Sequence, residues 1–147
     1  MSHITIMAIS DATISSNVWT TIRGIIVAAA PKVTYGTPSK TKTARIYAAY
    51  NDKEFKMPGI IIDPAEISES DYKFGSGVGK RMINVTVGCY YTTTQGTDQL
   101  ADTIMHAMSQ ADISGMELVG VTTDQAFVDP NQAKFQLKNI TFTFDRE

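Results

Sequence analysis

The sequence has few of the residues that are typical of disulfide-bonded, metal-stabilised or membrane-spanning proteins. It contains one cysteine, one tryptophan and two histidines in 147 residues. Cys89 has no partner for an intramolecular disulfide, and His3 and His106 are too far apart in sequence, without a cysteine pair, to form a metal site of their own. The longest apolar run, residues 24–30, holds seven residues, whereas a transmembrane helix needs about 20. We therefore expect neither a disulfide scaffold nor a membrane partner.

An excess of charge of one sign is also lacking. The 13 lysines and arginines nearly balance the 15 acidic residues, for a net charge of −2. A dedicated duplex-DNA binder normally carries a clear excess of lysine and arginine, so this class is disfavoured. Residues 1–9 hold neither a basic cluster nor a long apolar core, and we expect no secretion signal. With 43% apolar residues, the chain suits a single domain spanning 1–147 that buries a core without metal.

Two segments have the apolar spacing of amphipathic helices. In residues 10–30, apolar side chains recur at three- and four-residue steps until Pro31 ends the helix. In residues 97–111, the same spacing places Leu100, Ile104 and Met108 on one face, and Thr97 is the expected N-cap.

Other segments indicate strands. Residues 59–62 form a β-branched run, and residues 82–91 alternate with the two-residue period of a half-buried strand, which places Cys89 in the core as an inert thiol. Residues 115–128 and 134–144 suit an antiparallel hairpin, with a β-bulge near Lys138 and Asn139 where the alternation slips. These elements predict an α+β fold: a mostly antiparallel sheet of about four strands flanked by two helices. The expected order is helix, loop, strand, strand, helix, strand, strand.

Charge is distributed unevenly between the elements. Residues 31–57 are expected to form a long basic loop, with a short strand or helical turn near residues 44–50, and residues 68–80 a flexible hairpin tip. The candidate contact residues are Lys40, Lys42, Arg45, Lys53 and Lys56 in the first loop, Lys73, Lys80 and Arg81 in the second, and the acidic Asp63, Glu66, Glu69 and Asp71. Neighbouring segments of opposite sign suit head-to-tail contact between subunits, although plain solvated loops would carry the same charges.

No segment has the spacing of a catalytic or cofactor-binding motif. The glycine-rich segment 75–79 precedes Lys80, but a phosphate loop requires a glycine where Phe74 stands and a serine or threonine where Arg81 stands. The chain also lacks the nucleophile elbow of a serine hydrolase. We therefore expect no catalytic residues, no cofactor and no metal site, and a protein that is not an enzyme.

The order and character of the elements resemble a known family. The amphipathic helix at 10–30, the basic loop, the strand led by Pro58 and Gly59, the long strand, the second helix and the closing hairpin are similar to the tail terminator (tail completion) proteins of long-tailed bacteriophages. This resemblance implies a structural virion protein of the tail or neck, assembled in the host cytoplasm. Its copies would form a ring, a homohexamer, on the end of the tail tube.

The resemblance also implies a mechanism and a set of partners. The ring would stop tube polymerisation, join the tail to the head connector and leave a lumen for DNA. Its partners would be further copies of itself, the tail tube protein, head connector or neck proteins, and passing DNA. The alternatives are another head-tail neck protein, a small ligand-binding domain using the acidic stretch and the glycine loop, or a host-derived interaction module.

Overall fold

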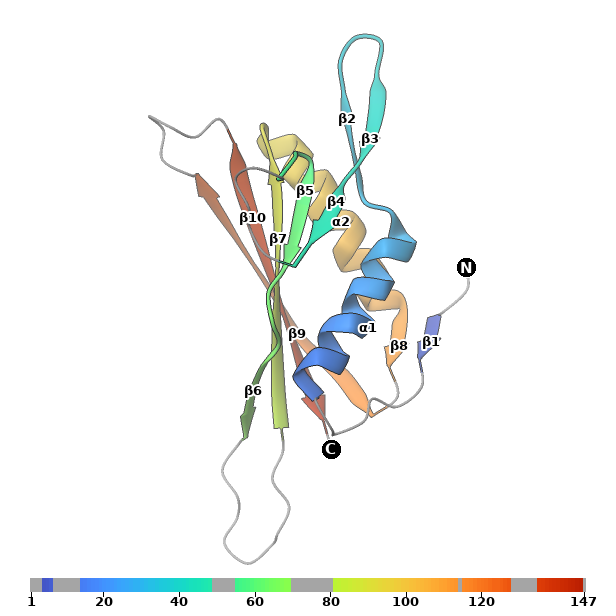
Figure 1. Cartoon of the computed structure of the whole chain (residues 1–147), viewed down its shortest axis with the longest axis vertical. Helices are drawn as coiled ribbons and strands as arrows, with labels where there is room; N and C mark the ends of the chain where they lie inside the picture. The colour runs from blue at the N-terminus through green and yellow to red at the C-terminus, as the bar shows by residue number, and fades with distance from the viewer. Residues whose placement is uncertain are drawn as a thin grey trace, which may run out of the picture.

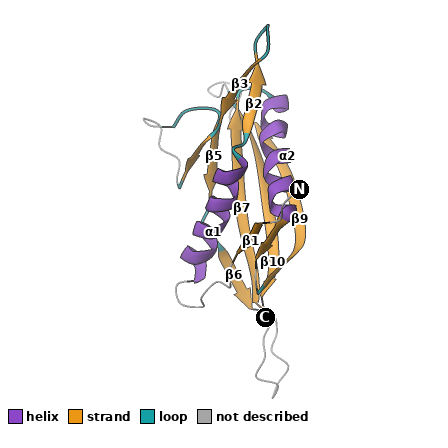
Figure 2. Ribbon diagram, turned by 90° about the vertical axis from the view of Figure 1, so that its right-hand side faces the viewer, coloured by secondary structure: helices purple, strands orange, loops and turns teal. Residues whose placement is uncertain are grey.

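Two helices lie on one face of a mostly antiparallel sheet, and Figure 2 looks onto this helical layer (Figures 1 and 2). The computed structural model describes residues 4–6, 14–48, 55–69, 81–113, 115–127 and 135–146. The elements in this part of the chain are β1 (Ile4–Ile6), α1 (Ile14–Ala29), β2 (Lys32–Tyr35), β3 (Lys40–Thr43), β4 (Arg45–Tyr47), β5 (Gly59–Ile62), β6 (Glu66–Glu69), β7 (Arg81–Tyr91), α2 (Thr94–Gln110), β8 (Ala111–Ile113), β9 (Met116–Phe127) and β10 (Gln136–Arg146).

The central sheet has the strand order β4-β5-β7-β10-β9, with β6 paired to the opposite end of β7 from β5. All neighbouring strands are antiparallel except β4 and β5. The α+β class is therefore as predicted, but the sheet has six strands rather than about four. The difference arises because β4 and β6 have three and four residues, too few to show an alternating pattern. Two smaller sheets pair β1 with β8 and β2 with β3.

The core lies between the sheet and the helices. On β7, the buried side chains are every second residue, and the register places Ile140, Phe142 and Phe144 of β10 beside Val87, Val85 and Ile83. The predicted strand at 82–91 and the buried position of Cys89 are both confirmed. Because successive side chains of a strand point to opposite faces, this alternation turns one face of the sheet toward the helices.

Helix α1 covers one part of this face. Val18, Ile22 and Ile26 are fully buried, as the three- and four-residue spacing predicts. The indole nitrogen of Trp19 donates a hydrogen bond to the carbonyl oxygen of Ile62 at 2.7 Å, which ties the helix to the end of β5. The helix ends at Ala29, one residue before Ala30 takes a positive φ of 48° and two before Pro31. The predicted start, at residues 10–13, lies outside the described residues.

Helix α2 begins three residues earlier than predicted. Its N-cap is Thr93, whose hydroxyl accepts a hydrogen bond from the backbone N–H of Gly96 at 3.1 Å, and Thr97 lies inside the first turn. A side chain at residue 96 would collide with Tyr91, because a Cβ placed there would lie 2.1 Å from its ring. Three consecutive threonines at 92–94 all suit a cap, so sequence preference did not select among them.

The predicted β-bulge near Lys138 and Asn139 is wrong. Strand β10 keeps one uninterrupted register with β7 from Gln136 to Arg146. The irregularity lies instead between β10 and β9, opposite Thr143 and Phe144. Leu137 causes the apparent slip in the sequence, because it points to the face away from the helices, where its methyl group lies close to Gly88.

The prediction of one long loop at residues 31–57 is also wrong. Strands β2 and β3 form a hairpin within it, and β4, at the position where a short strand or turn was expected, joins the central sheet. The lysine and threonine residues of β3 carry no apolar alternation, so the pattern that reveals half-buried strands is absent. Residues 49–54 lie outside the described part, as do residues 70–80 of the predicted hairpin tip. The flanking strands β6 and β7 pair antiparallel, with Glu69 opposite Arg81.

In the residues that the structure describes, neither helix is long and apolar enough to cross a membrane.

Candidate functional site

The hairpin β2–β3 projects beyond the helices and the central sheet (Figure 1), and its charged residues are all basic. Lys32, Lys40 and Lys42 are all exposed, and no acidic residue occurs in residues 32–43. The chain reverses through Gly36, whose φ of +80° is a conformation that glycine adopts without strain. The hairpin therefore presents a basic surface away from the body.

The root of this hairpin is fixed to the body at three points. Val33 is fully buried, and the backbone N–H of Ala44 donates to the carbonyl oxygen of Pro31 at 2.8 Å. The backbone N–H of Thr34 donates to Oε1 of Gln99 on α2 at 2.9 Å, while Nε2 of Gln99 donates to the Thr34 hydroxyl. From Tyr35 to Lys42 every side chain is exposed. The hairpin β2–β3, called the arm below, is thus anchored at its base, and its side chains are exposed along the rest of its length.

The other basic candidates lie on the body. Arg45 begins β4 and its side chain is exposed, while its backbone N–H donates to the carbonyl oxygen of Pro58 at 3.1 Å. Lys56 is also exposed, and its backbone N–H donates to the hydroxyl of Tyr47 at 3.1 Å. Lys53, Lys73 and Lys80 lie outside the described residues, and of the described basic candidates only Lys40 and Lys42 share one strand.

The acidic candidates follow β5 and continue along β6. Asp63 and Glu66 are exposed, and Glu69 ends β6. Partial burial, with the Glu66 carboxylate as the smaller cause, raises the pKa of Asp63 above its ordinary value. Helix α1 holds this segment through the hydroxyl of Ser15, which donates to the carbonyl oxygen of Ala65 at 2.9 Å. Asp71 lies outside the described residues.

Among the described residues, the basic candidates of the β2–β3 hairpin and the acidic candidates Asp63 and Glu66 lie in different parts of the molecule. Figure 1 shows the β2–β3 hairpin at one end of the long axis and β6 toward the other. Arg81, half-buried at the start of β7, lies at the β6 end, opposite Glu69. The basic hairpin and the acidic strand β6 are therefore separated along the molecule, and Arg81 is the described basic candidate that lies beside an acidic one.

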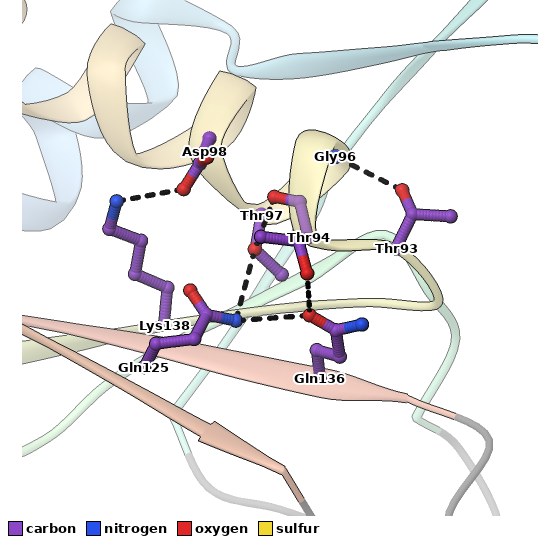
Figure 3. Close-up of polar contacts among 8 residues, drawn as sticks. All are labelled: Thr93, Thr94, Gly96, Thr97, Asp98, Gln125, Gln136 and Lys138. Carbon is purple, nitrogen blue, oxygen red and sulfur yellow. Dashed lines mark hydrogen bonds and ion pairs between the residues drawn. The ribbon is translucent and has the colours of Figure 1, made fainter.

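A polar cluster at the start of α2 was not predicted from the sequence (Figure 3). Nε2 of Gln125 on β9 donates to the Thr97 hydroxyl at 3.4 Å and to Oε1 of Gln136 on β10 at 3.3 Å, and the Thr94 hydroxyl also donates to Gln136. The cluster joins the first turn of α2 to the last two strands. Its members come from three distant segments, and no spacing along the chain links them.

An ion pair extends this cluster along the helix. Nζ of Lys138 on β10 lies 2.8 Å from Oδ1 of Asp98 on α2, with side chains 19% and 45% exposed (Figure 3). Partial exposure keeps such a pair's contribution to stability at about 1 kcal/mol or less. All these contacts are within the protein, so the cluster fixes α2 on the sheet rather than presenting groups to a ligand.

We expect Thr97→Val to lower the free energy of unfolding by about 1–2 kcal/mol. Thr97 is fully buried and its hydroxyl donates to the carbonyl oxygen of Thr94 at 2.8 Å, so valine keeps the shape but loses both hydrogen bonds. Urea unfolding followed by circular dichroism measures the change. Thr103→Val, on the same helix, removes only a local bond to the carbonyl oxygen of Gln99 and is expected to cost less than about 0.5 kcal/mol. Equal effects of the two substitutions would contradict the structural role of the cluster.

A row of aromatic rings lies on the sheet face away from the helices. Ring centroids of Tyr47 and Phe55 are 5.0 Å apart, those of Phe55 and Tyr90 are 5.0 Å apart, and those of Tyr90 and Phe135 are 5.8 Å apart. Such spacings are typical of stabilising aromatic pairs. The row anchors the strand-to-strand connection before β5 and explains why Tyr47 is half-buried.

A hollow of about 300 Å³ lies between the start of α1 and the ends of β4 and β5. Its lining includes the hydroxyl-bearing Ser15, Ser16 and Thr20 together with Trp19 and Pro64. Neither Asp63 nor Glu66 lines it, and the glycine-rich segment 75–79 lies outside the described residues. Among the residues described, no group of three or more histidine, cysteine, aspartate or glutamate side chains is arranged to hold a metal ion.

No protein-family profile and no curated protein matches this sequence.

Proposed function

We propose that this chain is a structural, non-enzymatic subunit of a long-tailed bacteriophage virion, of the tail terminator (tail completion) kind. Copies assemble as a ring, a homohexamer, on the end of the tail tube. The ring ends tube polymerisation and presents its other face to the head connector. The ring leaves a lumen through which DNA passes.

The observation that carries this proposal is that the basic β2–β3 hairpin projects from a small α+β domain with its side chains exposed. A two-stranded hairpin buries little surface by itself and is marginally stable in water. Here only Val33 at its root is buried, while Lys40, Lys42 and the turn between the strands are exposed. An arm of this kind gains stability from a neighbouring molecule, which is the arrangement expected of an assembly subunit.

The charge distribution supports head-to-tail assembly. A contact between two different surfaces of the same protein forms a ring when the rotation closes. The hairpin lysines and the acidic residues Asp63 and Glu66 lie on separate parts of the chain, so they serve contacts with different neighbours: adjacent subunits, the tube or the connector. Arg45 and Lys56, exposed on the body, are further candidates for contacts with the tube or with DNA.

Deleting the gene in its phage tests the function directly. We expect electron micrographs to show tails of uncontrolled length or tails that fail to join heads, and a plasmid copy of the wild-type gene to restore normal virions. Normal virions without the protein would refute the proposal. Tails of normal length that remain separate from heads would instead identify another neck protein. Tight stoichiometric binding of a nucleotide or a divalent cation by the purified chain, with normal virions in the deletion, would identify a ligand-binding domain.

A further inference from the structure

One edge of the central sheet is the long strand β9, which has an unpaired side in the described part of the chain. Strand β9 has 12 residues and pairs with β10 along one side, and no residue in the described part of the chain pairs with its other side. Val119 and Val121 on this strand are 47% and 41% exposed. An edge strand of this length, with exposed apolar side chains and without lysine or proline, is a site where a further strand adds through backbone hydrogen bonds.

The projecting hairpin has an open edge of its own. Strand β2 is engaged on its outer side by Gln99, which bonds to the backbone N–H of Thr34. Strand β3 pairs with β2 only, as far as the structure describes the chain, and all four of its side chains are exposed. The open backbone edge of the arm therefore belongs to β3.

The two open edges have complementary charge. Residues 32–43 of the hairpin carry three lysines and no acidic residue. Residues 116–127 of β9 carry Glu117 and Asp124 and no lysine, arginine or histidine. Charge complementarity of this kind favours contact between one protein surface and another.

The arm leaves the body beside one edge of the central sheet, and β9 forms the opposite edge. Strand β3 leads through Ala44 into β4, which is the strand at the far edge from β9. The bonds between Gln99 and Thr34 hold the root of the arm against α2. An arm on one side and an acceptor edge on the other are the elements of a head-to-tail contact that repeats around a ring.

We propose that β3 of one copy adds to the outer edge of β9 in the next copy, so that the basic hairpin is the arm through which subunits join. This inference rests on the proposed function in one respect, namely that copies of this chain associate with one another. The acidic strand β6 is the weaker acceptor. It has four residues, and α1 already occupies the carbonyl oxygens of Ile62 and Ala65 just before it through Trp19 and Ser15.

Charge reversal tests the contact. The concentration of half-assembly is measured by native mass for the wild type, for K40E/K42E, for E117K/D124K and for the variant with all four changes. Each double reversal is expected to raise this concentration by about tenfold or more, and the combined variant to bring it back to within about threefold of the wild type. R23E and D102K, at exposed positions on α1 and α2, control for the effect of a charge reversal outside the two edges, and circular dichroism verifies folding.

Cross-linking tests the pairing without relying on charge. A copy with T41C on β3 is mixed with a copy carrying T122C on β9 and treated with a short bismaleimide. Cys89 is buried and supplies no link. We expect a cross-linked dimer, and none when T41C is mixed with T20C on the exposed side of α1.

Several results would overturn the inference. A wild-type ring that is insensitive to both double reversals, with no link between T41C and T122C, would remove the arm contact and leave the proposed ring standing. Disassembly by D63K/E66K but not by E117K/D124K would move the acceptor to the β6 edge. Loss of double-stranded DNA binding by K40E/K42E, at unchanged native mass, would make the arm a nucleic-acid contact. A wild-type monomer at every concentration, without the cross-link, would also overturn the inference, and the deletion phenotype would then decide the proposed function separately.

Discussion

Replacing Phe142 with alanine is expected to lower the free energy of unfolding by about 3–5 kcal/mol. Phe142 is fully buried in the layer between the sheet and the helices, and the register places it between Val85 of β7 and Val121 of β9. Alanine would lose the apolar transfer free energy of the ring and leave a cavity that the paired strands cannot collapse to fill. Since small domains are stable by about 5–15 kcal/mol, this loss is a large fraction of the total.

Urea unfolding measures this loss, and the neighbouring residue supplies the control. Thr141 points to the other face of the sheet, where its hydroxyl lies 3.1 Å from that of Thr86. Thr141→Ala removes one half-exposed hydrogen bond and is expected to cost about 1 kcal/mol or less. A loss of less than about 1.5 kcal/mol for Phe142→Ala would contradict the placement of the core on this face of β10.

The thiol of Cys89 is expected to react about a thousandfold more slowly than an exposed thiol at pH 8. Burial raises the pKa of Cys89 from 9.0 to about 12, against a smaller opposing effect of the Lys138 ammonium. The reactive species is the thiolate, whose fraction at pH 8 falls about tenfold for each unit by which the pKa rises. Thiol titration with Ellman's reagent measures the rate, and the T122C variant provides an exposed thiol on the same protein. Equal rates for the two thiols would contradict the burial of Cys89.

The same shift has a consequence for stability at high pH. The folded protein holds the Cys89 thiol neutral, with a pKa of about 12 against 9.0 in the unfolded chain. Its contribution to stability is therefore complete below pH 9 and is lost progressively as the pH rises from 9 to 12. Cys89→Ala removes this part of the pH dependence, which urea unfolding at several pH values detects.

The charged candidates were found from the sequence only as residue types in segments. The sequence separates a basic segment from an acidic one because like charges cluster along the chain. It did not show that Lys40 and Lys42 lie on a projecting hairpin, because β3 has no apolar alternation. Nor did it show that β9 is an open edge, since strand order depends on which segments pair across the whole chain.

The sequence by itself determined the elements whose periodicity is long enough to be unambiguous. These are α1, α2 and the strand β7, each with at least 11 residues. An apolar side chain every second residue, or every third and fourth, fixes both the element type and the face that is buried. The burial of Cys89 follows from the same alternation.

The tertiary structure decided what depends on contacts between distant segments. Thr93 rather than Thr97 caps α2, because Gln125 and Gln136 from the last two strands draw the buried Thr97 and the exposed Thr94 into a polar cluster. Leu137 departs from the alternation of β10 without a bulge. Its side chain packs on the other face of the sheet, because Gly88 of β7 has no side chain there. In both cases several local choices have similar energies, and a packing or hydrogen-bond partner far along the chain selects one of them.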